Sequence, residues 1–93
     1  MRFHCSLDVN LKRELLDPQG KAVEASLPAM GWTNVSGVRI GKHIELYLEA
    51  DSQTEAMAQV QDMADRVLSN PVIEGFVIRD VSTKGTMTSE DHR

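Results

Sequence analysis

Residues 2–11 alternate strictly between polar and apolar side chains, and this pattern constrains the fold more than any other feature of the chain. The apolar positions are Phe3, Cys5, Leu7, Val9 and Leu11. Successive side chains of a β-strand point to opposite faces, so the alternation predicts a strand with one buried and one solvated face. The buried face needs a covering layer, which predicts a sheet packed against helices.

A helix is expected to begin soon after this strand. Asp17 is a favourable N-cap, and Pro18 suits the first helical position because an N–H there would have no partner. Gly31 suits the left-handed residue that ends a helix. Pro28 lies so near this end that we expect it to loosen only the last turn. The apolar face of the helix comprises Ala22, Val23, Leu27 and Met30.

The next segment, from Val38 to Leu48, carries its apolar residues at even positions. A two-residue hairpin turn at Gly41-Lys42 would mix apolar and polar residues on each face. A three-residue loop would keep the faces separate, and so would one long strand bent at Gly41. We favour the long bent strand, with the hairpin as the alternative.

A second helix and a last strand complete the pattern. Ser52 and Glu55 have the spacing of a capping box, and apolar residues then recur at helical spacing to about Ser69. Asn70 and Pro71 are expected to end this helix, because a residue before proline is disfavoured in helical geometry. The last strand, 72–81, has apolar residues at both odd and even positions. This pattern predicts that the strand is covered on both of its faces or lies inside a larger sheet.

Together these patterns predict one α+β domain over residues 1–81. We expect a small antiparallel sheet of ferredoxin-like character with both helices on one face. The small core and the two-sided last strand further predict an oligomer, at least a dimer. Residues 82–93 are polar and without periodicity, and we expect them to form a disordered tail.

Composition excludes several classes of function. The net charge of −4 and the 4% of aromatic residues argue against nucleic-acid binding. No apolar run approaches the ~20 residues that a membrane helix needs, so we expect a cytoplasmic protein. The single cysteine, Cys5, occupies an apolar strand position and is expected to be a small buried hydrophobe.

No catalytic or metal-binding constellation is evident in the sequence. Gly20-Lys21 opens a helix, but the glycine and hydroxyl residues that complete a phosphate loop are missing. His4, His43 and His92 have no ligand-like spacing to one another or to Cys5. We therefore expect neither a cofactor nor a metal on this chain.

Arg39 and Lys42 form one local basic patch in an acidic chain. Two interpretations remain open, a solvated strand surface or a docking site. In the second, the guanidinium of Arg39 would bind a carboxylate of a partner subunit through two parallel hydrogen bonds.

Three short motifs occur in order along the chain, each at a predicted junction between elements. They are Asp17-Pro18-Gln19-Gly20-Lys21, Arg39-Ile40-Gly41-Lys42 and Asn70-Pro71-Val72-Ile73-Glu74. In this order and spacing they resemble the PurS family, the small subunit of bacterial and archaeal phosphoribosylformylglycinamidine (FGAM) synthase. The resemblance covers about residues 1–81.

The resemblance implies a subunit without an active site of its own. The family's complex makes formylglycinamidine ribonucleotide from formylglycinamide ribonucleotide, ATP and glutamine in purine biosynthesis. It implies that this chain bridges a glutaminase subunit and a synthetase subunit and assists ammonia transfer, with ATP and magnesium on the synthetase. The candidate interface residues are then those of the motifs: Asp17, Pro18, Gln19, Gly20, Lys21, Arg39, Gly41, Lys42, Asn70 and Pro71.

The alternative from a different class is a ferredoxin-like regulatory domain that binds a small metabolite, an amino acid or a nucleotide. Such a domain would bind its ligand without any partner subunit, whereas a bridging subunit would not.

Overall fold

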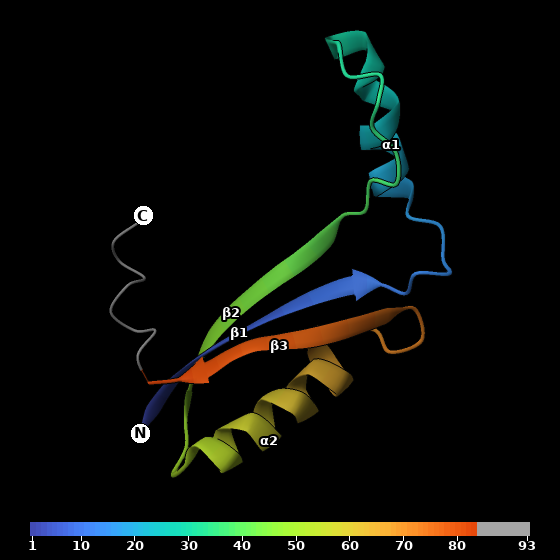
Figure 1. Ribbon diagram of the computed structural model, residues 1–93. Coiled ribbons are helices and arrows are strands. Elements are labelled where there is room, and N and C mark those ends of the chain that lie inside the picture. Colours follow the sequence, from blue (N-terminus) through green and yellow to red (C-terminus); the bar gives the residue numbers. More distant parts are fainter. Residues whose placement is uncertain (84–93) are drawn as a thin grey trace.

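The computed structural model describes residues 1–83, which form three strands and two helices in the order β-α-β-α-β. The elements are β1 (Arg2–Leu11), α1 (Pro18–Ser26), β2 (Gly41–Glu49), α2 (Gln53–Met63) and β3 (Glu74–Ser82). The strands form one antiparallel sheet in the order β2-β1-β3, and α2 lies across one face of it (Figure 1). The predicted α+β class with an antiparallel sheet is confirmed.

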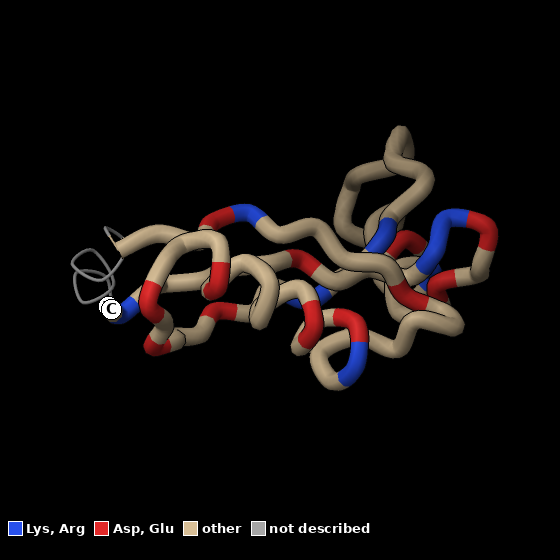
Figure 2. The backbone as a smooth tube through the Cα atoms, turned by 90° about the horizontal axis from the view of Figure 1, so that it is seen from below, with Lys and Arg blue, Asp and Glu red and all other residues tan. Residues whose placement is uncertain are grey.

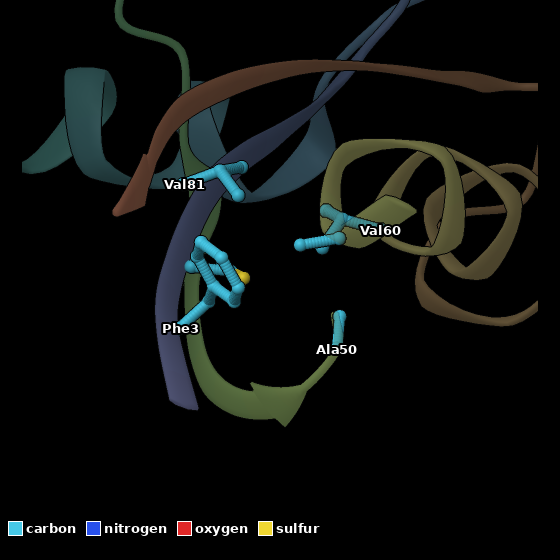
Figure 3. Close-up of a cluster of buried hydrophobic side chains, with 6 residues drawn as sticks. Phe3, Ala50, Val60 and Val81 are labelled. Atoms are coloured by element: carbon cyan, nitrogen blue, oxygen red, sulfur yellow. The ribbon is translucent and has the colours of Figure 1, made fainter. Parts of the chain in front are cut away.

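The alternating residues of β1 form the centre of the core, as predicted. Cys5 is fully buried opposite Leu46 of β2 and Val81 of β3. Burial, and secondarily the charge of Asp80, raises the pKa of the Cys5 thiol, as expected for a small buried hydrophobe. α2 covers the main cluster (Figure 3), which comprises Phe3, Cys5, Ala50, Ala56, Val60 and Val81. A second cluster towards the other end of β1 comprises Leu7, Val9 and Ala64.

The second helix begins and ends where the sequence predicts. The hydroxyl of Ser52 accepts a hydrogen bond from the N–H of Glu55 at 3.2 Å, so Ser52 is the N-cap. The helix continues through a π-helical turn, η2 (Ala64–Leu68). The hydroxyl of Ser69 then donates to the carbonyl of Ala64 at 2.7 Å, which closes the helix before Pro71.

The mixed pattern of the last strand has a different cause from the one predicted. Pairing with β1 steps from Asp80 directly to Ile78, so Arg79 is an extra, bulged residue. Because of this extra residue, the side chains that face α2 are at even-numbered positions before the bulge and at odd-numbered positions after it. The bulge therefore accounts for the mixed pattern without cover on both faces, and in the single chain Val77 on the other face is 49% exposed. The side chains directed towards α2 are Phe76, Ile78 and Val81.

The strand preceding α2 is also shorter than predicted, and neither hairpin nor bend occurs at Gly41-Lys42. β2 starts at Gly41, which pairs with Asn10, and residues 38–40 precede it without strand pairing. The cause is the N–H of Ile40, which donates to a carboxylate oxygen of Asp17 instead of continuing the ladder with β1.

The expectation that both helices lie on one face does not hold for α1. This helix projects beyond the end of the sheet (Figure 1) and packs mainly against η1 (Pro28–Met30), the short 3₁₀ turn that follows it. Pro28 was predicted to loosen only the last turn; α1 in fact ends at Ser26, and Pro28 begins a separate 3₁₀ turn. Gly31 is left-handed with φ 107°, as predicted. The radius of gyration is 16.8 Å, against about 12 Å for a compact chain of this size. We call residues 18–38, which leave and rejoin the sheet end, the arm.

The predicted boundary near residue 81 is close to the end of β3 at Ser82. The tail proposed for residues 82–93 lies outside the described residues from 84 onward, so that prediction is untested. Within residues 1–83, no helix has the length and apolar character needed to cross a membrane.

Candidate functional site

The three sequence motifs, far apart along the chain, meet at one end of the sheet. A carboxylate oxygen of Asp17 accepts from the N–H of Ile40 at 2.8 Å, which joins the first motif to the second. The ammonium of Lys42 lies 3.8 Å from a carboxylate oxygen of Glu74, which joins the second to the third. We call this region, at the base of the arm, the motif end.

Asp17 is buried and holds both sides of the base of the arm. Its Oδ1 accepts from the N–H of Gly20 at 2.9 Å, and its Oδ2 accepts from Ile40. These two N–H groups, Gly20 first, hold the pKa of the Asp17 carboxyl below its usual range. A Cβ at Gly20 would overlap the carbonyl oxygen of Val38, so only glycine lets the two chain segments approach this closely. Both residues are therefore structural.

The remaining residues of the first motif face solvent. Pro18 occupies the first turn of α1, as predicted, and Gln19 is exposed beside it. The backbone N–H of Lys21 donates to the carbonyl of Asp17, while its side chain is exposed and makes no ion pair within residues 1–83. Gln19 and Lys21 are thus accessible to another molecule.

The basic patch predicted for Arg39 and Lys42 is divided by the structure. The guanidinium of Arg39 donates to the carbonyls of Leu15 at 2.9 Å and Lys12 at 3.0 Å, on the loop that follows β1. Lys42 instead pairs with Glu74 on the sheet face that α2 covers. Arg39 therefore has a local structural role, and its neighbouring cation is Lys12 rather than Lys42.

The third motif forms a tight turn between η2 and β3. The carbonyl of Asn70 accepts from the N–H groups of Ile73 and Glu74, and its side chain accepts from Val72. The Glu74 carboxylate in turn accepts from the N–H of Asn70 at 2.7 Å. Pro71 lies exposed in this turn.

Two cavities, each of about 410 Å³, lie at the motif end. Residues of all three motifs line one of them: Val9, Leu11, Asp17, Pro18, Gln19, Ile40, Gly41, Lys42 and Glu74. The other opens at the end of β1 and β3 and is lined by Asn10, Leu11, Lys12, Arg13, Arg39, Gly75, Phe76 and Val77. No group of three His, Cys, Asp or Glu side chains placed to hold a metal ion occurs within residues 1–83.

The open face of the sheet carries a polar network that sequence reasoning missed. His43 lies 2.8 Å from Asp8 and 2.9 Å from Glu45, and His4 lies between Glu45 and Asp80. The two carboxylates beside His43, Asp8 first, raise the pKa of its imidazole, and His43 in turn lowers their pKa values. His43 and Glu45 share a face because they are two residues apart on β2. The strand register brings Asp8, His4 and Asp80 to them, and no local spacing signals that grouping.

Comparison with known proteins adds a consistent result. Residues 4–82 match the family model described as PurS, phosphoribosylformylglycinamidine (FGAM) synthase. The chain is 42% identical over 86 residues to the synthase subunit PurS of Synechocystis, an alignment that covers 92% of this chain and 86% of the relative.

Two solved structures resemble the fold closely. One is Methanocaldococcus jannaschii PurS, which is described as a subunit of formylglycinamide ribonucleotide amidotransferase in the purine biosynthetic pathway. It superposes with a TM-score of 0.74 and 26% sequence identity, and the match covers 86% of this chain and 95% of that chain. The other is a chain in the structure of PurLQS from Thermotoga maritima, with a TM-score of 0.78 and 30% sequence identity. This match covers 85% of this chain and 96% of that chain.

Proposed function

Because this chain belongs to the PurS family of FGAM synthase subunits in purine biosynthesis, we propose that it bridges the glutaminase and synthetase subunits of that enzyme. It contributes no catalytic group of its own and assists ammonia transfer by holding the two active subunits together. ATP and magnesium bind to the synthetase partner. A related chain occurs in a solved structure described as PurLQS, which supports association with PurL and PurQ.

The observation that carries this proposal is the convergence of the three motifs on one exposed end of the sheet. Their polar side chains mainly satisfy backbone groups, as those of Asp17, Arg39 and Asn70 do. Such bonds fix a surface and its projecting arm rather than act on a substrate. A preformed surface loses little conformational entropy on binding, which favours a docking function.

A second copy of this chain is the proposed cover for surfaces that the single chain leaves open. α2 packs over β1 and β3, so the α2-side residues of β2 are only half-buried: Ile44, Leu46 and Leu48. The arm in turn exposes apolar side chains, with Met30 67% and Trp32 52% exposed. Packing the arm of one copy on β2 of the other would bury both, and a stable interface needs about 1,000 Å² in total.

The single tryptophan, Trp32, reports this dimer directly. Dilution of the purified chain should shift its fluorescence to the red as the arm is released, together with a fall in mass by light scattering. A monomer at micromolar concentration, with unchanged emission, would contradict the dimer but leave the bridging function untouched.

Reconstitution of the enzyme tests the bridging function. The purified glutaminase and synthetase subunits are assayed with and without this chain, using either glutamine or saturating ammonium as the nitrogen source. Glutamine-dependent synthesis should require the chain, because only that reaction needs the two subunits held together, whereas ammonia-dependent synthesis should persist without it. Equal glutamine-dependent synthesis in its absence would refute the proposal.

The metabolite-binding alternative is favoured by one observation, the cavity lined by all three motifs. Its volume of about 410 Å³ falls in the range of small-ligand sites. Calorimetry of the isolated chain with glutamine, glycine and adenine nucleotides distinguishes the two functions. Heat of binding to the chain alone would support the regulatory domain, and the bridging function predicts none.

A further inference from the structure

Two histidines lie among three carboxylates on the face of the sheet that α2 leaves open. We call these five residues the histidine network: Asp8, His43, Glu45, His4 and Asp80. The ring nitrogens of His43 lie 2.8 Å from an oxygen of Asp8 and 2.9 Å from one of Glu45. Those of His4 lie 3.3 Å from Glu45 and 3.2 Å from Asp80. The network therefore joins β2 to β3 across β1, although β2 and β3 do not pair with each other.

Both ring nitrogens of each histidine face a carboxylate oxygen, and this geometry fits the charged imidazole. A neutral imidazole has one N–H, so its second nitrogen would direct a lone pair at a carboxylate. The two carboxylates beside His43, Asp8 first, raise the pKa of its imidazole, which agrees with the geometry. When His43 loses its proton, one of its two bonds breaks and the other loses the strength that the charge gives it.

Glu45 is the member of the network that the two histidines share. Its Oε2 faces His43 and its Oε1 faces His4, and its ion pairs within residues 1–83 are both with these imidazoles. Asp8 differs, because its second oxygen accepts from the guanidinium of Arg79 at 2.8 Å. Asp8 thus keeps a cationic partner when His43 is neutral, whereas Glu45 depends on the proton for its position.

His4 is enclosed between the two edge strands. Its side chain is only 14% exposed, and its ring lies 5.4 Å from that of Tyr47, over which the guanidinium of Arg2 stacks at 4.0 Å. Asp80, on the other side of His4, also accepts from the hydroxyl of Ser82 at 3.0 Å. His4 is therefore placed to pass a change at the carboxylate of β2 on to the carboxylate of β3.

We propose that the histidine network is a proton-controlled latch: a proton on His43 fixes Glu45, which holds His4 and so ties β2 to β3. The latch is closed below pH 6.5 and opens as the pH rises through the folded pKa of His43. Opening adds negative charge to a chain of net charge −4, whose acidic segments, red in Figure 2, are spread along the molecule. Repulsion between the carboxylates then favours the open state. The latch does not depend on the bridging function.

An NMR titration of the purified chain measures the coupling between the strands. The imidazole carbon shifts of His43 give its titration midpoint, and the backbone amide shift of Asp80 reports on β3. In wild type we expect the Asp80 amide to shift with the midpoint of His43, although the two strands do not pair. In Glu45→Gln the His43 midpoint should move to lower pH, because that carboxylate raises its pKa, and the Asp80 amide should no longer follow it.

Glu49→Gln is the matched control, since it removes the same charge from the same strand and the ion pair of Glu49 is with the N-terminal ammonium. It should leave both titrations unchanged. His4→Gln is a second test that keeps Glu45 beside His43, so His43 should still titrate while the Asp80 amide no longer follows it. An Asp80 amide that ignores the His43 titration in wild type, or follows it equally in Glu45→Gln or His4→Gln, would overturn the latch and leave the bridging function untouched.

Discussion

Replacing Gly20 with alanine should loosen the base of the arm by about 2 kcal/mol. An alanine in place of a helical glycine normally stabilises a helix by about 1 kcal/mol. Here the added Cβ would overlap the carbonyl of Val38, which is backbone and cannot rotate away. Overpacking of this kind costs typically about 1–3 kcal/mol. Relief would separate the two segments and break one of the bonds between them, Asp17–Ile40 or Glu24–Val38, worth about 1 kcal/mol. The steric and hydrogen-bond losses together exceed the helical gain.

Amide hydrogen exchange measures this change where it occurs. A loss of about 2 kcal/mol raises the opening equilibrium of α1 about 30-fold, so its amides and that of Ile40 should exchange correspondingly faster. The matched control is Gly75→Ala, because a Cβ at Gly75 meets nothing within 4 Å. Unchanged or slower exchange of α1 in Gly20→Ala would refute the argument that glycine is required for this close approach.

Three further changes concern the stability of the sheet, measured by urea unfolding. Val60→Ala should lower the free energy of unfolding by about 2 kcal/mol, because Val60 is fully buried. The control Val67→Ala changes a residue that is 77% exposed and should alter the free energy of unfolding by less than about 0.5 kcal/mol. Equal effects of the two substitutions would contradict the placement of the core. Lys42→Ala should lower it by less than about 1 kcal/mol, since the pair with Glu74 is long and its ammonium is exposed; a larger loss would show that the pair is structural. Because the pKa of His43 is raised in the folded chain, the stability that protonated His43 contributes is complete below pH 6.5 and is lost as the pH rises through the folded pKa. His43→Gln should therefore flatten the decline in the free energy of unfolding above pH 6.5. An unchanged pH profile would exclude His43 as the cause of that decline.

Local signals in the sequence predicted the local structure well. The alternation of residues 2–11 identified the central strand, and side-chain capping identified the starts of both helices at Asp17 and Ser52. The burial of Cys5 and the end of the second helix before Pro71 followed from similar reasoning. Each of these features depends on residues within a few positions of one another, which is why the sequence alone sufficed.

Features set by distant contacts were not predictable in this way. The bulge at Arg79 depends on pairing with β1, and without it the odd and even apolar residues of β3 suggested two buried faces. The apolar face of α1 indicated that this helix packs against another surface. It could not indicate that this surface is η1 and not the sheet of the same chain.

The candidate site was predicted in part. The motif residues were identified by resemblance, yet their convergence on one end of the sheet depends on bonds between residues more than 20 positions apart, such as Asp17–Ile40. The grouping of Arg39 with Lys42 followed their closeness in sequence, whereas Arg39 lies with Lys12 and Arg13 in the structure. Adjacent Lys12 and Arg13 at the end of a predicted strand were the available signal for that cluster.

Sedimentation velocity of the purified glutaminase and synthetase subunits, with and without this chain, tests the bridging function most directly. With all three proteins present, the account predicts one boundary that contains both catalytic subunits, and separate boundaries when this chain is omitted. A glutaminase–synthetase complex that forms equally well without the chain, or a three-protein mixture that sediments as separate components, would contradict it.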